Sequence, residues 1–216
     1  MKYAMLVVFV VTTAIHLYAS LKKNKPLRDK TKPFILLSLL GFYVYSVDII
    51  NVNVVLALIF SWIGDMFLIL NGVKWFAVGG VSFMISHFFF ILSYLSNINF
   101  ANINTIVIVV LAIFFFVTVS IIFSRLKDHL PKALFYPMFL YLLINGAMNC
   151  FAIFRFLSCV ELASIITVIG AILFFISDCS LFFVRFKKDC LLKTHFLVML
   201  TYSIGELLIV TGLILG

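Results

Sequence analysis

Apolar runs of about twenty residues follow one another along almost the whole chain, separated by short polar or basic segments. Runs of that length match the ~30 Å hydrocarbon core of a bilayer when they are helical. With 65% hydrophobic and 11% charged residues, the chain is much more apolar than a soluble globular protein, in which about 45–50% of the residues are apolar. The sequence therefore predicts an integral membrane protein and excludes a soluble enzyme.

We predict eight spanning helices in one all-α membrane domain, residues 1–216. Only helices and closed barrels satisfy their backbone polar groups in lipid, and continuous apolar runs favour helices over the alternating strands of a barrel. The expected fold is a polytopic transmembrane helical bundle. The predicted helices span residues 3–20, 33–47, 54–70, 76–95, 105–123, 133–153, 161–183 and 195–215. We expect the first to be retained rather than cleaved as a signal peptide, because a basic cluster follows it.

The basic residues fall almost entirely on one side of the membrane when the chain crosses it eight times. Leaving out helix 33–47 would split the sixteen lysines and arginines seven against nine. Because cytoplasmic loops carry an excess of these residues, we expect both termini to be non-cytoplasmic, in a bacterial inner membrane. Fourteen share the cytoplasmic side: Lys22, Lys23, Lys25, Arg28, Lys30, Lys32, Lys74, Arg125, Lys127, Lys132, Arg185, Lys187, Lys188 and Lys193. The net charge of +8 thus reflects topology and attraction to anionic lipid headgroups, and does not indicate nucleic acid.

The two halves of the chain resemble each other in two places, each time four predicted helices apart. Residues 64–68 and 177–181 both follow the pattern small-Asp-x-x-Leu, and residues 82–87 and 201–206 match at their hydroxyl, aromatic, isoleucine, small and ionisable positions. Helices four apart run in the same direction, as a parallel repeat requires. The sequence therefore suggests a parallel four-plus-four repeat.

Two aspartates lie inside apolar runs at matched depth. Asp65 and Asp178 are each about five residues before the cytoplasmic end of a predicted helix, which is about 7 Å at ~1.5 Å per residue. Ionisable groups in such positions mark a functional interior by default. Two carboxylates in one poorly solvated site do not easily both ionise, so the pair can supply a general acid beside a general base. The structural alternative is that each aspartate bonds to helix backbones or to Ser61 and Ser177 and only fixes the packing.

Further polar residues lie deeper in the predicted helices. His87 and Glu206 fall near the middle of the membrane, where they either pair, polarise the aspartates or serve the structure. Tyr141, Asn145 and Asn149 recur every four residues and share one helix face. That face either lines a polar cavity or makes interhelical hydrogen bonds.

The cysteines do not indicate a metal or disulfide site. Cys150, Cys159, Cys179 and Cys190 show no CxxC spacing and lie mainly within or beside apolar runs. Neither a metal knuckle nor a disulfide framework is indicated. We expect no metal and no organic cofactor, and no obligate protein partner is evident.

Five motifs follow one another in a fixed order: Thr31-Lys32-Pro33, Phe60-Ser61-x-x-Gly64-Asp65, Ser82-Phe83-x-x-x-His87, Gly170-Ala171-x-x-Phe174-x-x-Ser177-Asp178 and Leu200-Thr201-Tyr202. This ordered set resembles the YhhN-like lysoplasmalogenase family, whose members are eight-span membrane proteins that cleave the vinyl ether bond of lysoplasmalogens. The family usually carries glutamine where Glu206 stands here, so substrate or activity could differ.

The resemblance implies a lysophospholipid substrate taken from the bilayer and hydrolysis to a fatty aldehyde and a glycerophospho-alcohol. Asp65 and Asp178 would then be catalytic, by a logic parallel to that of the two-carboxylate glycosidases. The matched motifs add Lys32, Ser61 and Tyr202 as supporting or substrate-binding residues. A buried acid pair and a parallel repeat also fit a different class, a small proton-coupled transporter or lipid-moving protein.

Overall fold

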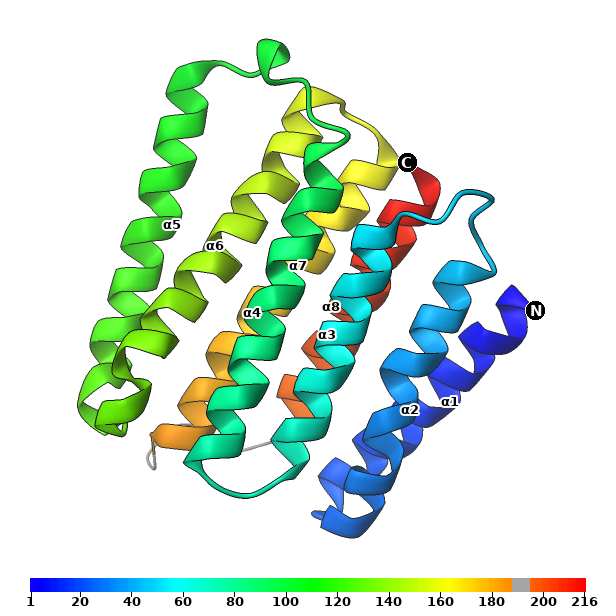
Figure 1. Ribbon diagram of the computed structural model, residues 1–216, viewed down its shortest axis with the longest axis vertical. Helices are drawn as coiled ribbons and strands as arrows, with labels where there is room; N and C mark the ends of the chain where they lie inside the picture. The colour runs from blue at the N-terminus through cyan, green and yellow to red at the C-terminus, as the bar shows by residue number, and fades with distance from the viewer. Residues whose placement is uncertain (188–194) are drawn as a thin grey trace.

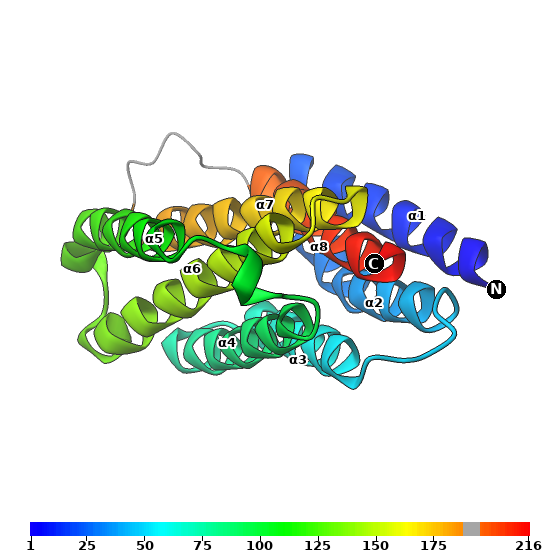
Figure 2. The same ribbon diagram turned by 90° about the horizontal axis from the view of Figure 1, so that it is seen from above.

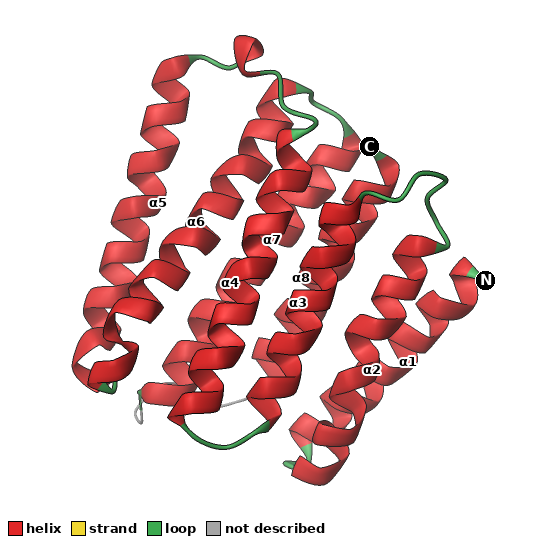
Figure 3. Ribbon diagram, viewed as in Figure 1, coloured by secondary structure: helices red, strands yellow, loops and turns green. Residues whose placement is uncertain are grey.

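The computed structural model describes residues 1–187 and 195–216. This part of the chain consists of α-helices and short 3₁₀ turns and contains no strand (Figure 3). The helices are α1 (Lys2–Leu21), α2 (Lys25–Val44), α3 (Val52–Ile69), α4 (Val73–Leu95), α5 (Thr105–Leu126), α6 (Phe135–Ser158), α7 (Leu162–Phe186) and α8 (His195–Leu215). The all-α prediction is confirmed. Apart from α2, the helix ends lie within about five residues of their predicted positions.

The predicted bounds of the second helix, residues 33–47, are wrong. Helix α2 begins at Lys25, where the Asn24 side chain accepts a hydrogen bond from the Leu27 amide, and it ends at Val44. Pro33 was expected to open the helix, but it lies inside α2. The apolar run predicts only the part of the helix that can lie in lipid. The first turns of α2 are charged, so a hydropathy pattern does not detect that they are helical.

Seven helices are long and apolar enough to cross a membrane, and α2 is the one described helix outside that set. The first two turns of α2 explain this, because they contain four basic residues and one acid. These residues are Lys25, Arg28, Asp29, Lys30 and Lys32. The eight-span topology therefore stays a prediction.

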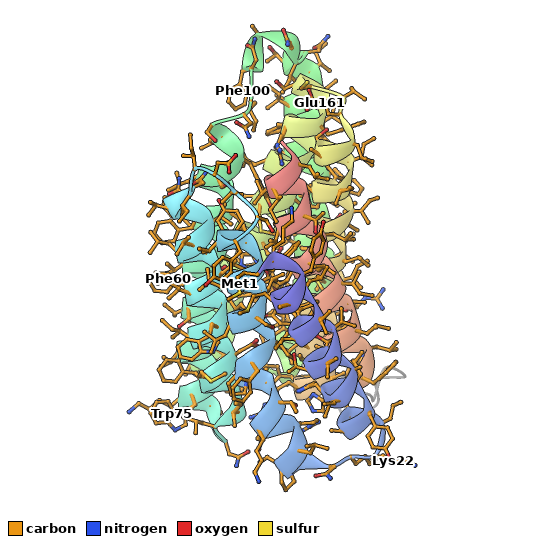
Figure 4. All side chains as sticks on the ribbon, turned by 90° about the vertical axis from the view of Figure 1, so that its right-hand side faces the viewer. Met1, Lys22, Phe60, Trp75, Phe100 and Glu161 are labelled. Atoms are coloured by element: carbon orange, nitrogen blue, oxygen red, sulfur yellow. The ribbon has the colours of Figure 1, made fainter. Side chains whose placement is uncertain are left out.

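Consecutive helices run antiparallel, and the two termini lie at the same end of the bundle (Figure 1). In the view from above, α6 lies between α5 and α7 on one side and α4 on the other (Figure 2). Helix α8 packs mainly on α7 and also contacts α1 and α2. Figure 4 shows Lys22 and Trp75 at one end of the bundle and Phe100 and Glu161 at the opposite end. The α1–α2, α3–α4 and α5–α6 connections meet at the end that carries Lys22 and Trp75. We call it the basic end, because most of the lysines and arginines lie in or next to these connections.

The bundle is apolar outside and polar in places inside, which is the arrangement expected in lipid. The outer faces of α1 and α5 expose large apolar side chains such as Val7, Val10, Ile106 and Phe114. Among residues 1–187 and 195–216, eighteen polar or charged residues are buried, including Asp65 and Asp178. Buried ionisable groups in a membrane bundle face its interior or a water-filled cavity.

Two helix pairs approach closely through glycines, as small residues permit in membrane helices. On α3 and α4, a Cβ added to Gly64 would lie 3.1 Å from the carbonyl oxygen of Gly79. On α7 and α8, a Cβ added to Gly170 would lie 2.7 Å from the carbonyl oxygen of Gly205. The two contacts differ in register, since Gly64 directly precedes Asp65 whereas Gly170 lies eight residues before the second aspartate. The parallel repeat stays a prediction.

We expect Gly170→Ala to destabilise the bundle by about 1–3 kcal/mol, the usual cost of overpacking. The added methyl group meets backbone atoms of Gly205 and Ile209 at 2.7 Å, and backbone cannot rotate away. The measurement is thermal unfolding of the purified protein in detergent. Gly80→Ala is the matched control, because a Cβ there meets no atom within 4 Å. Equal melting temperatures for the two variants would contradict the predicted contact.

Candidate active site

Asp65 and Asp178 line one cavity of about 110 Å³ that opens at the basic end of the bundle. Helices α3 and α7 supply the two aspartates and several other lining residues, and α1, α2, α4 and α8 also contribute to the wall. Both carboxylates are buried, with exposed fractions of 2% and 5%. The cavity thus brings together two residues that are more than one hundred positions apart in the sequence.

Asp65 is held by two hydrogen-bond donors. Lys32 places its ammonium nitrogen 3.1 Å from Asp65 Oδ1, and the Tyr202 hydroxyl donates to Asp65 Oδ2 at 3.1 Å. Helix α2 is fixed on α3 at this point, because the Trp62 indole N–H donates to the Pro33 carbonyl at 3.0 Å. A carboxylate whose neighbours are a cation and a hydroxyl donor is stabilised in its ionised form.

Asp178 has a different set of partners, all on its Oδ2 atom. The Tyr141 hydroxyl donates to this oxygen, and Asn145 Nδ2 donates to it at 2.7 Å. Asn149 in turn donates to the Asn145 carbonyl at 3.0 Å and so steadies that turn of α6.

The polar face of α6 supports an aspartate and does not line the aspartate cavity. Tyr141, Asn145 and Asn149 share one face as predicted, but none of the three is part of the cavity wall. They are buried between α6 and α7, where two of them bind Asp178. Of the two alternatives for this face, the structure has interhelical hydrogen bonds, which Tyr141 and Asn145 make to Asp178 of α7.

His87 lies against Asp178 and not against Glu206. Its Nδ1 is 2.5 Å from the Phe83 carbonyl oxygen, which can only accept, so Nδ1 carries a proton. Its Nε2 is 3.3 Å from Asp178 Oδ2, in an orientation that makes no regular hydrogen bond. A lone pair facing a carboxylate at this distance would be repelled, so the two groups are best satisfied when they hold one proton between them. Of the alternatives in the sequence analysis, polarisation of the aspartate site is the one that this geometry favours.

The serines do not bond to the aspartates in this structure. Ser61 and Ser86 share a hydrogen bond of 2.7 Å, and Ser177 donates to the Val198 carbonyl at 2.8 Å. Glu206 is fully buried behind the cavity, and within the described residues neither of its carboxylate oxygens has a hydrogen-bond partner. The packing alternative, in which Ser61 and Ser177 satisfy the aspartates, therefore has no support in the geometry.

Four residues at the cavity mouth were not among the site residues predicted from the sequence. His16, Arg28, Arg185 and His195 line the cavity, whereas the arginines had been assigned to topology alone. Spacing carried a signal, because Arg28 lies one helical turn before Lys32 and shares its face. His16 does make the kind of contact expected of a structural residue, since its Nδ1 is 2.9 Å from the Thr31 hydroxyl.

No group of three metal-ligating side chains occurs among residues 1–187 and 195–216. Cys150, Cys159 and Cys179 are free thiols, and Cys190 lies outside the described residues. The cavity itself presents carboxylates, a hydroxyl donor and cations.

A helical membrane bundle with two differently supported aspartates in a cavity open at one end is the class of protein that the fold and site define. The model of the YhhN family matches residues 27–213 of this chain, a stretch that includes every motif of the resemblance. The chain belongs to the YhhN family. No curated protein and no solved structure matches it.

Proposed function

We propose that this protein is a membrane lipid hydrolase that cleaves the vinyl ether bond of lysoplasmalogens. The observation that carries the proposal is the shared cavity in which Asp65 stands beside a cation while Asp178 stands beside a histidine. Environments that separate the protonation of two carboxylates mark an acid and a base. Membership of the YhhN family is consistent with a hydrolase.

In the proposed mechanism Asp178 is the general acid. It transfers a proton to the alkene carbon that is not bonded to oxygen, and the electrons of the double bond leave an oxocarbenium ion. Tyr141 and Asn145 donate to Oδ2 and so hold the carboxyl group in place. Before the transfer, Asp178 shares its proton with His87.

Asp65 is proposed to act as the ionised partner. Its negative charge stabilises the oxocarbenium ion, and it accepts a proton from the water that adds to the cationic carbon. The resulting hemiacetal collapses as Asp178 accepts its hydroxyl proton and Asp65 gives its own proton to the alcohol oxygen, which releases a fatty aldehyde and a glycerophospho-alcohol. One water is consumed, and both carboxyl groups return to their starting states.

The deciding experiment incubates purified protein in neutral detergent with a 1-alkenyl lysophospholipid in D₂O. We expect a fatty aldehyde with one deuterium on the carbon next to the carbonyl, together with the glycerophospho-alcohol. The saturated 1-alkyl analogue is the control, since it has no alkene to protonate. Absence of turnover in detergent, combined with lipid movement across proteoliposomes, would replace the proposal by the transporter alternative.

His87→Gln is expected to lower turnover by less than Asp178→Asn does. Glutamine keeps a polar group near Asp178 but cannot hold a proton that it can return. Because His87 is proposed to act through Asp178, the double variant should be no slower than Asp178→Asn alone. The measurement is aldehyde release by purified variants, and losses that multiply in the double variant would contradict the coupling.

The eight-span topology is part of the proposal and places the cavity mouth on the cytoplasmic side. We expect reporter domains fused to either end of the chain to be active only outside the cytoplasm, because both termini lie opposite the basic end (Figure 1). A reporter in the α3–α4 connection, at residues 70–72, should be active only inside. A cytoplasmic C-terminal reporter would overturn this orientation.

A further inference from the structure

Five side chains that are cationic or can become so gather at the mouth of the aspartate cavity. They come from four helices, two near each end of the chain: His16 from α1, Arg28 and Lys32 from α2, Arg185 from α7 and His195 from α8. His195 lies within electrostatic range of the other three cations of α2 and α7. The basic residues at this end are therefore not only spread over the loops but also concentrated around one opening.

The charges at the mouth are only partly compensated. Lys32 has a carboxylate within ion-pair distance, at 3.1 Å. Among the described residues, Arg28 and Arg185 have none, although Asp29 also lines the mouth. The guanidinium of Arg185 instead lies over the ring of Phe76, 5.7 Å from its centre. Like charges held together repel one another, so an added anion would stabilise this arrangement.

We propose that the mouth binds the phosphate group of a single-chain amphiphile, with Arg28 and Arg185 as the main contacts. Guanidinium groups present planar pairs of donors that match phosphate oxygens. Arg185 lies seven residues beyond Asp178 on α7, about 10 Å along the helix at ~1.5 Å per residue. A phosphate at the mouth and a reacting bond at the aspartates are thus separated by the length of a short, glycerol-like linker. The phosphate site is a subsite of the aspartate cavity. That the amphiphile is a lysophospholipid rests on the proposed function.

The positive-inside rule requires basic residues on one side of the membrane, but it does not require them to gather around the cavity mouth. The excess of positive charge at the basic end is also supplied by Arg125, Lys127 and Lys132 of the α5–α6 region, none of which lines the cavity. Arg125 is exposed at the end of α5. It therefore serves as a control, since Arg125→Gln removes a positive charge from the same end of the bundle but outside the cavity.

Thermal stabilisation tests the phosphate subsite without any turnover. Purified protein in neutral detergent is melted with dodecyl phosphate, with dodecyl glycerol or with inorganic phosphate alone. We expect dodecyl phosphate to raise the melting temperature more than dodecyl glycerol, and Arg28→Gln/Arg185→Gln to lose that difference while Arg125→Gln keeps it. Stabilisation by inorganic phosphate alone would assign the site to free phosphate. Equal responses of all three proteins to dodecyl phosphate would overturn the subsite.

Turnover provides a second, separate test. In the double arginine variant we expect the KM for a 1-alkenyl lysophospholipid to rise about tenfold to hundredfold, the effect of losing hydrogen bonds between charged groups. The KM for 1-alkenyl glycerol, which lacks the phosphate, should not change. Equal rises for both substrates would contradict the subsite, whereas no turnover by the unmodified protein would contradict the proposed reaction and leave the melting test to decide the subsite.

A second inference concerns an apolar groove between α4 and α6. Ala77, Gly80, Val81 and Met84 line it from α4, and Pro137 is among the residues that line it from α6. The groove contains no charged residue, and part of its lining is exposed on the outer surface of the bundle.

The groove adjoins the aspartate cavity. Phe76 lines both spaces, and Tyr141, whose hydroxyl binds Asp178, closes the groove from inside. The cavity itself, at about 110 Å³, is too small for a hydrocarbon chain of a lipid. We infer that the chain of the bound amphiphile lies in this groove, on the outside of Phe76.

Gly80 allows the groove to be filled without disturbing the helices. A Cβ at Gly80 meets no atom within 4 Å, so Gly80→Leu places its side chain in the groove, with Gly80→Ala as the control. In the unmodified protein and in Gly80→Ala we expect the stabilisation by alkyl phosphates to grow from the hexyl to the dodecyl compound. In Gly80→Leu this growth should disappear while the melting temperature without ligand stays the same. Growth with chain length in all three proteins would show that the chain lies elsewhere.

Discussion

Asp65→Asn and Asp178→Asn are each expected to reduce vinyl ether hydrolysis by about 10²–10⁴, the usual cost of losing a general acid or base. Asparagine keeps the shape of aspartate and can still accept a hydrogen bond, but it neither donates an acidic proton nor carries a negative charge. Asp65→Asn removes the charge beside Lys32, and Asp178→Asn removes the proton shared with His87. The measurement is aldehyde release by purified variants.

The double variant Asp65→Asn/Asp178→Asn separates a shared mechanism from two independent roles. Residues that act as a unit in one step give losses that do not multiply. We therefore expect the double variant to be little slower than the slower single variant. Asp128→Asn, at an exposed turn outside the cavity, controls for the substitution itself. Near-normal turnover in either single variant would refute the two-aspartate mechanism, and loss of folding in both would support the packing alternative.

Lys32→Met is expected to lower the free energy of unfolding by about 3–5 kcal/mol, because it leaves the buried Asp65 carboxylate without its cation. Lys32 is largely buried and Asp65 almost completely so, with side-chain exposures of 13% and 3%. Methionine preserves much of the apolar stem of lysine, so the loss reflects the charge and not the packing. The measurement is denaturant or thermal unfolding in detergent.

A second substitution should reverse the loss of stability but not the loss of activity. In Lys32→Met/Asp65→Asn the uncompensated charge is gone, and the Tyr202 hydroxyl retains an acceptor. We expect the double variant to regain most of its stability and to remain inactive. Lys30→Met, at an exposed position of the same helix, is the control. A double variant less stable than Lys32→Met would show that Asp65 serves the packing and not the cavity.

Much of the candidate site could be predicted from particular residues. Asp65 and Asp178 could be singled out because they are acids within apolar runs. Their expected equal distance from the helix ends is wrong, since Asp65 lies four residues before the end of α3 and Asp178 eight residues before the end of α7. The spacing of Tyr141, Asn145 and Asn149 predicted a shared face on α6, because the helical period is a local property. In these cases the information lies within one helix, and neighbouring residues in sequence are enough to recover it.

The partners of these residues could not be predicted in the same way. No local pattern shows that Lys32 meets Asp65, that His87 meets Asp178 and not Glu206, or that Tyr141 lies behind an aspartate. Each of these contacts depends on which helices are neighbours and how they are rotated. The same limit explains α2, since hydropathy detects where a helix can contact lipid but not where its backbone is capped.

Hydrophobicity and helical periodicity are local properties, so the sequence is enough to predict an all-helical membrane protein of the YhhN family with two acids inside its apolar helices. Tertiary packing is needed to know that the acids line one cavity, that each has a different partner, and that Arg28 and Arg185 stand at its mouth. These facts depend on close packing between helices, as at Gly170 and Gly205, where backbone contact determines which side chains can meet.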